Sequence, residues 1–258
     1  MTDSEKPVEV ELIISPASSS RVPADPLIDS VHKLDRGRAH AIECIAHTAK
    51  WADALRDRPE PVYDPKTGTT SYHFSPLADI DPAIRLTAAD ALHNYRSALD
   101  QAISICCRLM GNSPRDSFFP TGHDLRRFEA NLAKQVPKLP APVIACLREL
   151  EPYYGGRGEL LRALHDLNNE DKHNNLISTE FSIQQAHLAV DEDGTNKLLS
   201  LGVTITFAGV PLLKNVPIAQ ALEDINAAAG TAFLAVGNIM GRYFYARSLT
   251  VAAELYRG

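Results

Sequence analysis

Residues 81–110 carry the pattern on which the fold prediction depends, DPAIRLTAADALHNYRSALDQAISICCRLM. Asp81 before Pro82 is a typical helix start, because aspartate accepts free backbone N–H groups and proline suits the first helical position. Apolar residues then recur every three or four positions, at Ile84, Ala88, Leu92, Tyr95, Leu99, Ala102, Cys106 and Leu109. This spacing predicts one long amphipathic helix with a single buried stripe.

The same spacing on both sides of this helix predicts a helical bundle. A long helix is expected over 25–58, with Asp25 as its cap and a buried stripe of Leu27, Val31, Leu34, Ile42, Ile45, Ala49 and Ala52. Shorter helices are expected near 124–134, 140–150 and 158–172. A heptad seam of Leu222, Ile225, Ala229, Ala232, Val236, Ile239 and Tyr243 predicts a long C-terminal helix. Gly237 and Gly241 on that helix favour a close crossing with another helix.

The remaining segments have β character. Apolar and polar residues alternate over 8–14, and a Pro/Gly turn divides the β-prone stretch 60–75. Two further β-rich runs lie within 176–210, joined by an Asp-Glu-Asp-Gly turn. We therefore expect a single α+β domain over 1–258. It is mainly a helical bundle of long amphipathic helices (25–175 and 217–256), with one small antiparallel β-sheet collecting the strands near 8–14, 60–75 and 176–210.

The composition of the chain argues against some functional classes and compartments. The 258 residues carry a formal net charge of −6, so the global positive field of non-specific nucleic-acid binders is absent. The polar, acidic N-terminus does not have the pattern of a signal peptide, and no apolar run is long enough for a bilayer, which predicts a cytoplasmic protein with no membrane partner. The four cysteines lack Cys-x-x-Cys spacing and are expected to be buried thiols.

Sequence motifs for cofactors and common catalytic sites are also missing. There is no Gly-x-Gly-x-x-Gly, P-loop, Gly-x-Ser-x-Gly or His-Glu-x-x-His motif. We expect no cofactor and no metal, and the sequence assigns no catalytic residue.

One polar segment lies in the middle of the helix over 81–110. At 3.6 residues per turn, His93, Arg96 and Asp100 share one face, and Asn94 lies on the neighbouring row. The simplest interpretation is a solvated face with an Arg96–Asp100 pair. The alternative is that this face holds a ligand or a buried polar network.

A second polar segment ends the helix over 158–172 and reads HDLNNEDKHNN from His165. Its candidate site residues are Asn168, Asn169, Asp171, Lys172 and His173. Asp171 falls where the next apolar residue of the helix is due, so it lies either beyond the buried face or inside it with a partner. The simple interpretation is a solvated helix end, where Lys172 and His173 suit the negative end of the helix dipole.

The two segments, with their flanking motifs, resemble a family of uncharacterised bacterial and phage-borne proteins. The resemblance covers about residues 60–180 and rests on the hairpin Asp64 to Gly68, His93 to Asp100, Phe119-Pro120, Pro152-Tyr153 and Leu164 to His173. In that family the first motif continues to an Arg-x4-His spacing, which is similar to the signature of the HEPN superfamily. The resemblance therefore implies a helical fold, a homodimer and an RNA or nucleotide ligand. In this chain Gln101 takes the place of that histidine, and Asn174 takes the place of an arginine that commonly follows the second motif in the family.

Three hypotheses follow for the function. The first is a non-catalytic HEPN-like binding module, in which the two segments meet and Arg96, Asp100, Asn169, Asp171 and His173 form a polar network. The second is a metal-independent endoribonuclease, in which His93 or His173 replaces the histidine missing at Gln101. The third is a metal site built from His93, Asp100, Asp171 and His173. We favour the first.

Overall fold

The structure, a computed structural model, describes residues 26–56, 59–74, 80–173, 176–190 and 196–255. Its elements are α1 (Ile28–Arg56), β1 (Pro59–Asp64), β2 (Thr69–Phe74), α2 (Pro82–Leu109), α3 (Leu125–Ala133), α4 (Ala141–Leu150), α5 (Glu159–His173), β3 (Thr179–Val190), β4 (Asn196–Phe207), a short 3-10 turn (Pro211–Leu213) and α6 (Ile218–Leu255). The expected α+β class with mainly helical content is confirmed. The strand expected near 8–14 and the Asp25 cap lie outside the described residues.

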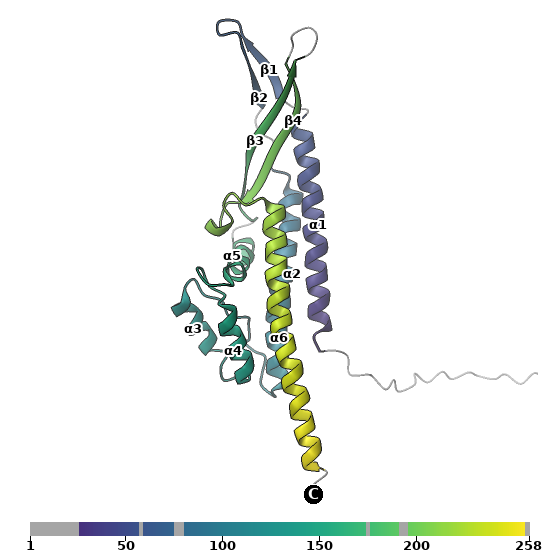
Figure 1. Cartoon of the computed structure of the whole chain (residues 1–258), viewed down its shortest axis with the longest axis vertical. Helices are drawn as coiled ribbons and strands as arrows, with labels where there is room; N and C mark the ends of the chain where they lie inside the picture. Colours follow the sequence, from purple (N-terminus) through teal and green to yellow (C-terminus); the bar gives the residue numbers. More distant parts are fainter. Residues whose placement is uncertain (1–25, 57–58, 75–79, 174–175, 191–195, 256–258) are drawn as a thin grey trace, which may run out of the picture.

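Three long helices, α1, α2 and α6, lie side by side and form an elongated rod (Figure 1). The central helix is α2, and its start agrees with the sequence, because the Asp81 side chain accepts the Ala83 N–H at 2.9 Å. Its expected stripe is buried from Ile84 to Cys106, while Leu109 at its end is 42 % exposed. The shorter helices α3, α4 and α5 cover one side of the rod (Figure 1).

The buried face of α1 differs from the expected one. Ile42 is 60 % exposed and Ala49 is exposed, whereas Ala41, Cys44 and Leu55 are buried. The face that packs on α2 is the one with small residues, because they let the two helices approach closely. At Gly37, an added Cβ would lie 2.6 Å from a ring carbon of Tyr95 on α2. The periodicity in α1 was therefore correct. Leu27, Val31 and Leu34 of the expected stripe pack against the core, but the prediction was wrong for Ile42 and Ala49, which are exposed.

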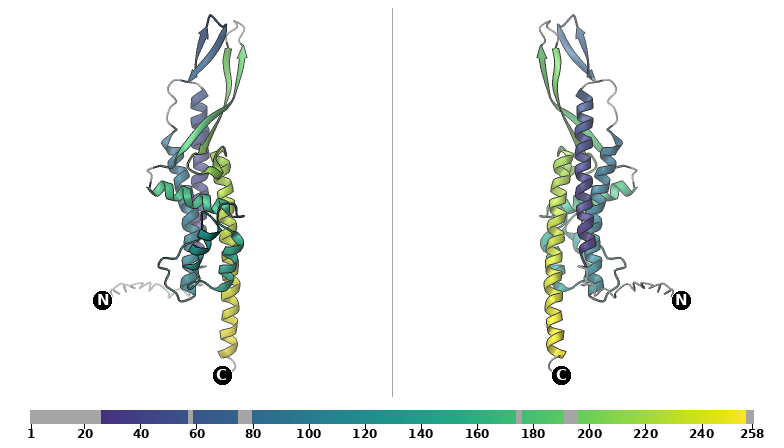
Figure 2. Two further views of the ribbon diagram at one scale, coloured as in Figure 1. Left: turned by 90° about the vertical axis from the view of Figure 1, so that its left-hand side faces the viewer. Right: turned by 90° about the vertical axis from the view of Figure 1, so that its right-hand side faces the viewer.

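The heptad seam of α6 faces the core. Leu222, Ile225, Ala229, Ala232 and Val236 are all buried, as expected. The helix continues to Leu255 and runs past the ends of α1 and α2 (Figures 1 and 2). At Gly237, an added Cβ would lie 3.1 Å from Cδ1 of Leu27, so this glycine does permit a close approach to the start of α1.

The expectation of one joint sheet is wrong for the described strands. β1 pairs only with β2, and β3 pairs only with β4, each as an antiparallel hairpin. Strands joined by a tight turn satisfy each other's backbone groups locally, so the two hairpins need no common sheet. Both extend from the same end of the rod (Figure 2).

All four cysteines are buried free thiols, in agreement with the sequence. Burial raises the pKa of Cys44 to about 11 and that of Cys106 to about 12. Of the helices that the structure describes, none combines the length and the apolar character needed to cross a bilayer.

Candidate functional site

The Asn-rich part of α5 contacts the polar face of α2. Leu161, Leu164 and Leu167 bury one face of α5, and Asn168 continues that face with an exposed fraction of 3 %. A buried amide requires a hydrogen-bond partner. His93 of α2, which is an exposed residue, supplies it, because its Nδ1 lies 3.3 Å from Oδ1 of Asn168. We call this contact and the polar groups beside it the α2–α5 seam.

Arg96 forms a buried clamp next to this contact. Its side chain is 6 % exposed, and its Nη2 lies 2.8 Å from Oδ1 of Asp100. Nη2 also donates to the Phe119 carbonyl at 2.7 Å, while the Phe119 N–H donates to Oδ1 of Asp100 at 2.8 Å. The guanidinium carbon lies 5.9 Å from the centre of the Phe119 ring. The ion pair on α2 therefore holds both backbone groups of Phe119, in the loop that leads to α3.

The positive charge of Arg96 is buried and paired with Asp100 rather than exposed to solvent. Burial lowers the pKa of its guanidinium, the carboxylate of Asp100 opposes that effect, and the nearby charge of Arg162 lowers the pKa further. Arginine has so high an ordinary pKa that it stays protonated. Its Nη1 is also buried and has no hydrogen-bond partner among the residues that the structure describes. One donor of this buried cation is thus both unpaired among these residues and closed off from the surface.

A second ion pair continues the seam along α5. Nε of Arg162 donates to Oδ2 of Asp166 at 3.0 Å, and Nη2 donates to Oδ1 of the same carboxylate. The Tyr154 hydroxyl donates to Asp166 at 2.8 Å. Burial, and then the bond to Asp166, raise the pKa of Tyr154. His123, which is exposed, lies edge-on to the Tyr154 ring with 5.5 Å between the ring centres.

The structure brings some of the sequence-predicted site residues together and separates others. His93 meets Asn168, and Arg96 meets Asp100, but Asn94 donates to the Asp90 carbonyl of its own helix at 2.8 Å. Asn169 lies 2.9 Å from Nε2 of His165, rather than in a network with Arg96.

The other predicted residues lie at the end of α5. Asp171 is half-buried there. Lys172 and His173 close the helix, and their side chains lie outside the described part of the chain. Of the predicted network, the structure shows the Arg96–Asp100 arm and, apart from it, the His93–Asn168 contact.

Sequence reasoning missed the residues that complete the seam. The Arg162–Asp166 pair has the i,i+4 spacing of a helical ion pair, which was the signal available for it. The bond from Tyr154 and the role of the Phe119 backbone had no such signal, because they join segments distant in sequence. The Phe119-Pro120 and Pro152-Tyr153 motifs marked those segments without giving their contacts.

A metal is poorly matched to this seam. Oδ1 of Asp100 already accepts from both Arg96 and Phe119, so its carboxylate has little capacity left for a cation. Within the described ranges, no three His, Cys, Asp or Glu side chains converge as metal ligands would.

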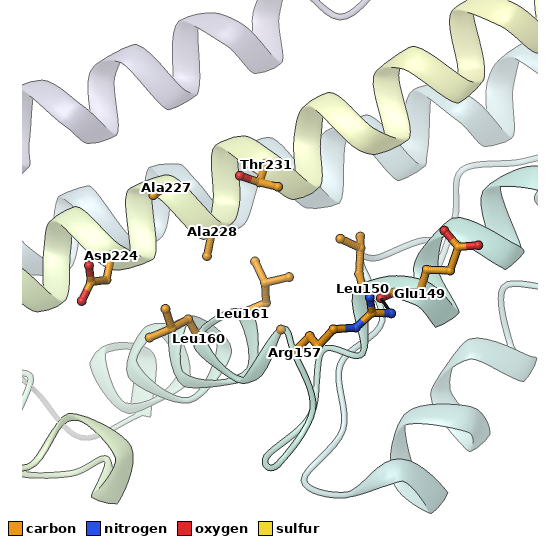
Figure 3. Close-up of a pocket in the computed structure, with 10 residues that line it drawn as sticks. Glu149, Leu150, Arg157, Leu160, Leu161, Asp224, Ala227, Ala228 and Thr231 are labelled. Atoms are coloured by element: carbon orange, nitrogen blue, oxygen red, sulfur yellow. Dashed lines mark hydrogen bonds between the residues drawn. The ribbon is translucent and has the colours of Figure 1, made fainter.

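A separate pocket of about 470 Å³ lies between the end of α4, the start of α5 and α6 (Figure 3). Leu160 and Leu161 of α5 face Ala228 of α6 across it, and Asp224 lies at one end. Arg157 is held at its rim by Glu151, at 3.2 Å, and by the carbonyl of Glu149. The pocket thus has an apolar floor, with Asp224 at one end and Glu149 beside Arg157 at the other.

The seam and the pocket are the two candidate sites that this fold positions. The first has buried charges and one buried donor without a partner in the described part of the chain, and the second is largely apolar. Comparison of the chain with family models, with curated proteins and with solved structures finds no match.

Proposed function

We propose that this protein is a non-catalytic, HEPN-like helical binding module whose α2–α5 seam binds a nucleotide. The observation that carries the proposal is the clamp of Arg96. A catalytic arginine must contact the reacting phosphate, but Arg96 is buried and already holds Asp100 and the Phe119 carbonyl. Its remaining donor, Nη1, has no partner among the described residues but is itself buried, so a phosphate oxygen reaches it only when the seam opens.

The neighbouring groups support an anionic ligand. Arg162 lies close enough to influence the pKa of Arg96, and it is partly exposed. Two neighbouring guanidinium groups form a set that recognises phosphate oxygens. His93 and His123 are exposed near the two ends of this set and can donate to or stack on the rest of a nucleotide.

A nuclease would need a proton-transfer group beside Arg96. Gln101 stands where the superfamily pattern has histidine, and an amide does not exchange protons near neutral pH. His93 is hydrogen-bonded to Asn168 instead. For this reason we place the endoribonuclease second.

Binding and cleavage are tested on the same preparation. Titration calorimetry with AMP and with inorganic phosphate is expected to show saturable binding of AMP, weakened at least tenfold by Arg162→Met. Arg148→Met is the matched control, because Arg148 forms an exposed pair with Glu129 on another helix. Absence of AMP binding to the wild-type protein would refute the nucleotide assignment.

The nuclease alternative needs a labelled RNA incubated with the protein in EDTA. We expect no cleavage. Cleavage that disappears in Arg96→Lys, with the circular dichroism spectrum unchanged, would replace the binding module by an enzyme. Cleavage that persists in this variant would be assigned to a contaminating nuclease and leave the proposal standing.

A further inference from the structure

The outer face of α6 lacks the charges that solvent-exposed helices normally carry. From Ile225 to Gly241 the helix contains no charged residue. Its exposed positions there recur at heptad spacing: Ala227, Thr231, Leu234, Asn238 and Gly241. A solvated helix face is usually rich in Lys, Glu and Arg, whereas an uncharged stripe with period 3.5 is typical of a helix that packs on another helix. We call these five residues the outer stripe.

An apolar groove of about 610 Å³ adjoins the outer stripe at the end of the rod opposite the hairpins. Leu27 and Val31 of α1, Leu109 of α2 and Phe233, Met240 and Phe244 of α6 line it. Leu234 at its edge is 61 % exposed, and Leu109 is 42 % exposed. At Gly241, an added Cβ would meet nothing within 4 Å, so the groove is open there. Leucines this exposed beside an open apolar groove mark a contact surface.

The charges at the two ends of the outer stripe have opposite signs. Glu223 and Asp224 precede it, and Arg242 follows it. Two such helices placed antiparallel would bring the acidic end of one against the basic end of the other, whereas a parallel pair would place like charges together. The pattern is therefore complementary to itself in one orientation only.

We propose that the outer stripe binds the outer stripe of a second copy of this chain, with the two α6 helices antiparallel and crossing at Leu234. This surface is distinct from the α2–α5 seam, and the inference does not depend on the proposed ligand. The contact is isologous, as in most dimers with two-fold symmetry. Leu234 of each copy lies against Leu234 of the other, at the edge of both apolar grooves.

The axial distances fit this arrangement. At 1.5 Å per residue, Asp224 lies about 15 Å before Leu234, and Arg242 lies about 12 Å after it. In an antiparallel pair the two charges therefore come within about 3 Å of each other along the axis, well within the reach of an arginine side chain. Ala227 falls opposite Gly241, so two small residues face each other on either side of the crossing.

The pocket between α4, α5 and α6 gives this contact a second anchor. Asp224 and Glu149 lie at its rim, beside the apolar floor formed by Leu160, Leu161 and Ala228 (Figure 3). Arg157 is already held by Glu151 and by the Glu149 carbonyl. The long side chain of Arg242 of the partner subunit can lay its stem over the apolar floor and its guanidinium against Asp224.

The oligomeric state tests the inference directly. Size-exclusion chromatography with light scattering, from 5 to about 100 μM protein, is expected to give twice the monomer mass of 28.2 kDa for the wild type. Leu234→Glu is expected to give the monomer, as is Asn238→Glu, which introduces a charge at an exposed position without touching the core. Leu86→Glu is the matched control, because Leu86 is a leucine of α2 that is 51 % exposed away from the stripe.

The orientation is tested by charge exchange and by cross-linking. Arg242→Asp is expected to raise the dimer dissociation constant at least tenfold, and Asp224→Arg in the same chain is expected to restore it. Ala227→Cys combined with Gly241→Cys is expected to form intermolecular disulfides, while either substitution alone is not. A wild-type monomer at about 100 μM would overturn the inference. So would a Leu234→Glu dimer, or disulfides formed by either single cysteine variant, which indicate parallel helices.

Discussion

Removal of Asp100 is predicted to destabilise the protein far more than a surface ion pair would. In the Asp100→Ala variant the guanidinium of Arg96 stays buried, with 6 % of its side chain exposed, but loses its counter-ion. The Phe119 N–H also loses its acceptor. Breaking a buried pair from one side typically costs 3–5 kcal/mol, and because the Asp100 side chain is 36 % exposed we expect about 3 kcal/mol.

Removal of Arg96 is predicted to cost less. In Arg96→Met the apolar stem is kept, and Asp100 can still accept from Phe119 and from water. The main loss is the donor to the Phe119 carbonyl, for which we expect about 1–2 kcal/mol. The double variant leaves no buried charge, so its cost should fall short of the sum of the two single costs by about 2 kcal/mol.

Urea unfolding followed by circular dichroism at 222 nm measures these three free energies. Glu129→Ala is the matched control, because its bidentate pair with Arg148 is 40–53 % exposed and should contribute less than about 1 kcal/mol. If Asp100→Ala unfolds within about 1 kcal/mol of the wild type, or if the single costs add in the double variant, the clamp does not have the role assigned to it.

Three further predictions concern the core and the loops. Burial raises the pKa of Cys44 and Cys106 above the ordinary value of 9.0, so their contribution to stability is complete below pH 9 and is lost as the pH rises toward 11–12. These two thiols should thus lower the free energy of unfolding by on the order of 2 kcal/mol from pH 8 to pH 10, and burial raises the pKa of Cys107 and Cys146 in the same direction. Cys44→Ala should remove its own share of that fall, and a flat profile would contradict the burial. Iodoacetamide at pH 8 should leave all four thiols unmodified in the native protein and alkylate all four in guanidinium chloride. Gly122→Ala should cost about 2 kcal/mol or more in urea unfolding, because the new Cβ would fall on the backbone of Phe128; an unchanged midpoint would show that the loop can move.

Periodicity was sufficient to predict the helices and the buried faces of α2 and α6, but not the whole buried face of α1. The stripe of α2 was found because a central helix is apolar on most sides, so few wrong choices exist. In α1 the prediction missed Gly37, Ala41 and Cys44 because small residues have little hydrophobic signal, although close packing on α2 needs them, as Gly37 shows at Tyr95 and Cys44 at Ile84. Which of two faces is buried depends on the neighbouring helix, which a single helix sequence does not contain.

The candidate site shows the same limit. The spacing in the sequence placed Arg96 beside Asp100, and the structure has that pair. The clamp on Phe119 joins residues 19 and 23 positions apart, and the His93–Asn168 contact joins residues 75 apart. Such contacts depend on how loops return to the bundle, and a local pattern holds no information on that. The amide of Asn168 was recognised as polar, but its burial was visible only once α5 was placed on α2.

The position of α6 in the chain has a consequence for synthesis. Its buried face completes a core that also includes α1, α2 and α5, yet it follows all of them along the chain. While the ribosome is still making α6, the earlier helices have emerged with apolar surface uncovered. We therefore expect the nascent chain to be a client of chaperones until α6 is released, and to fold only after that point.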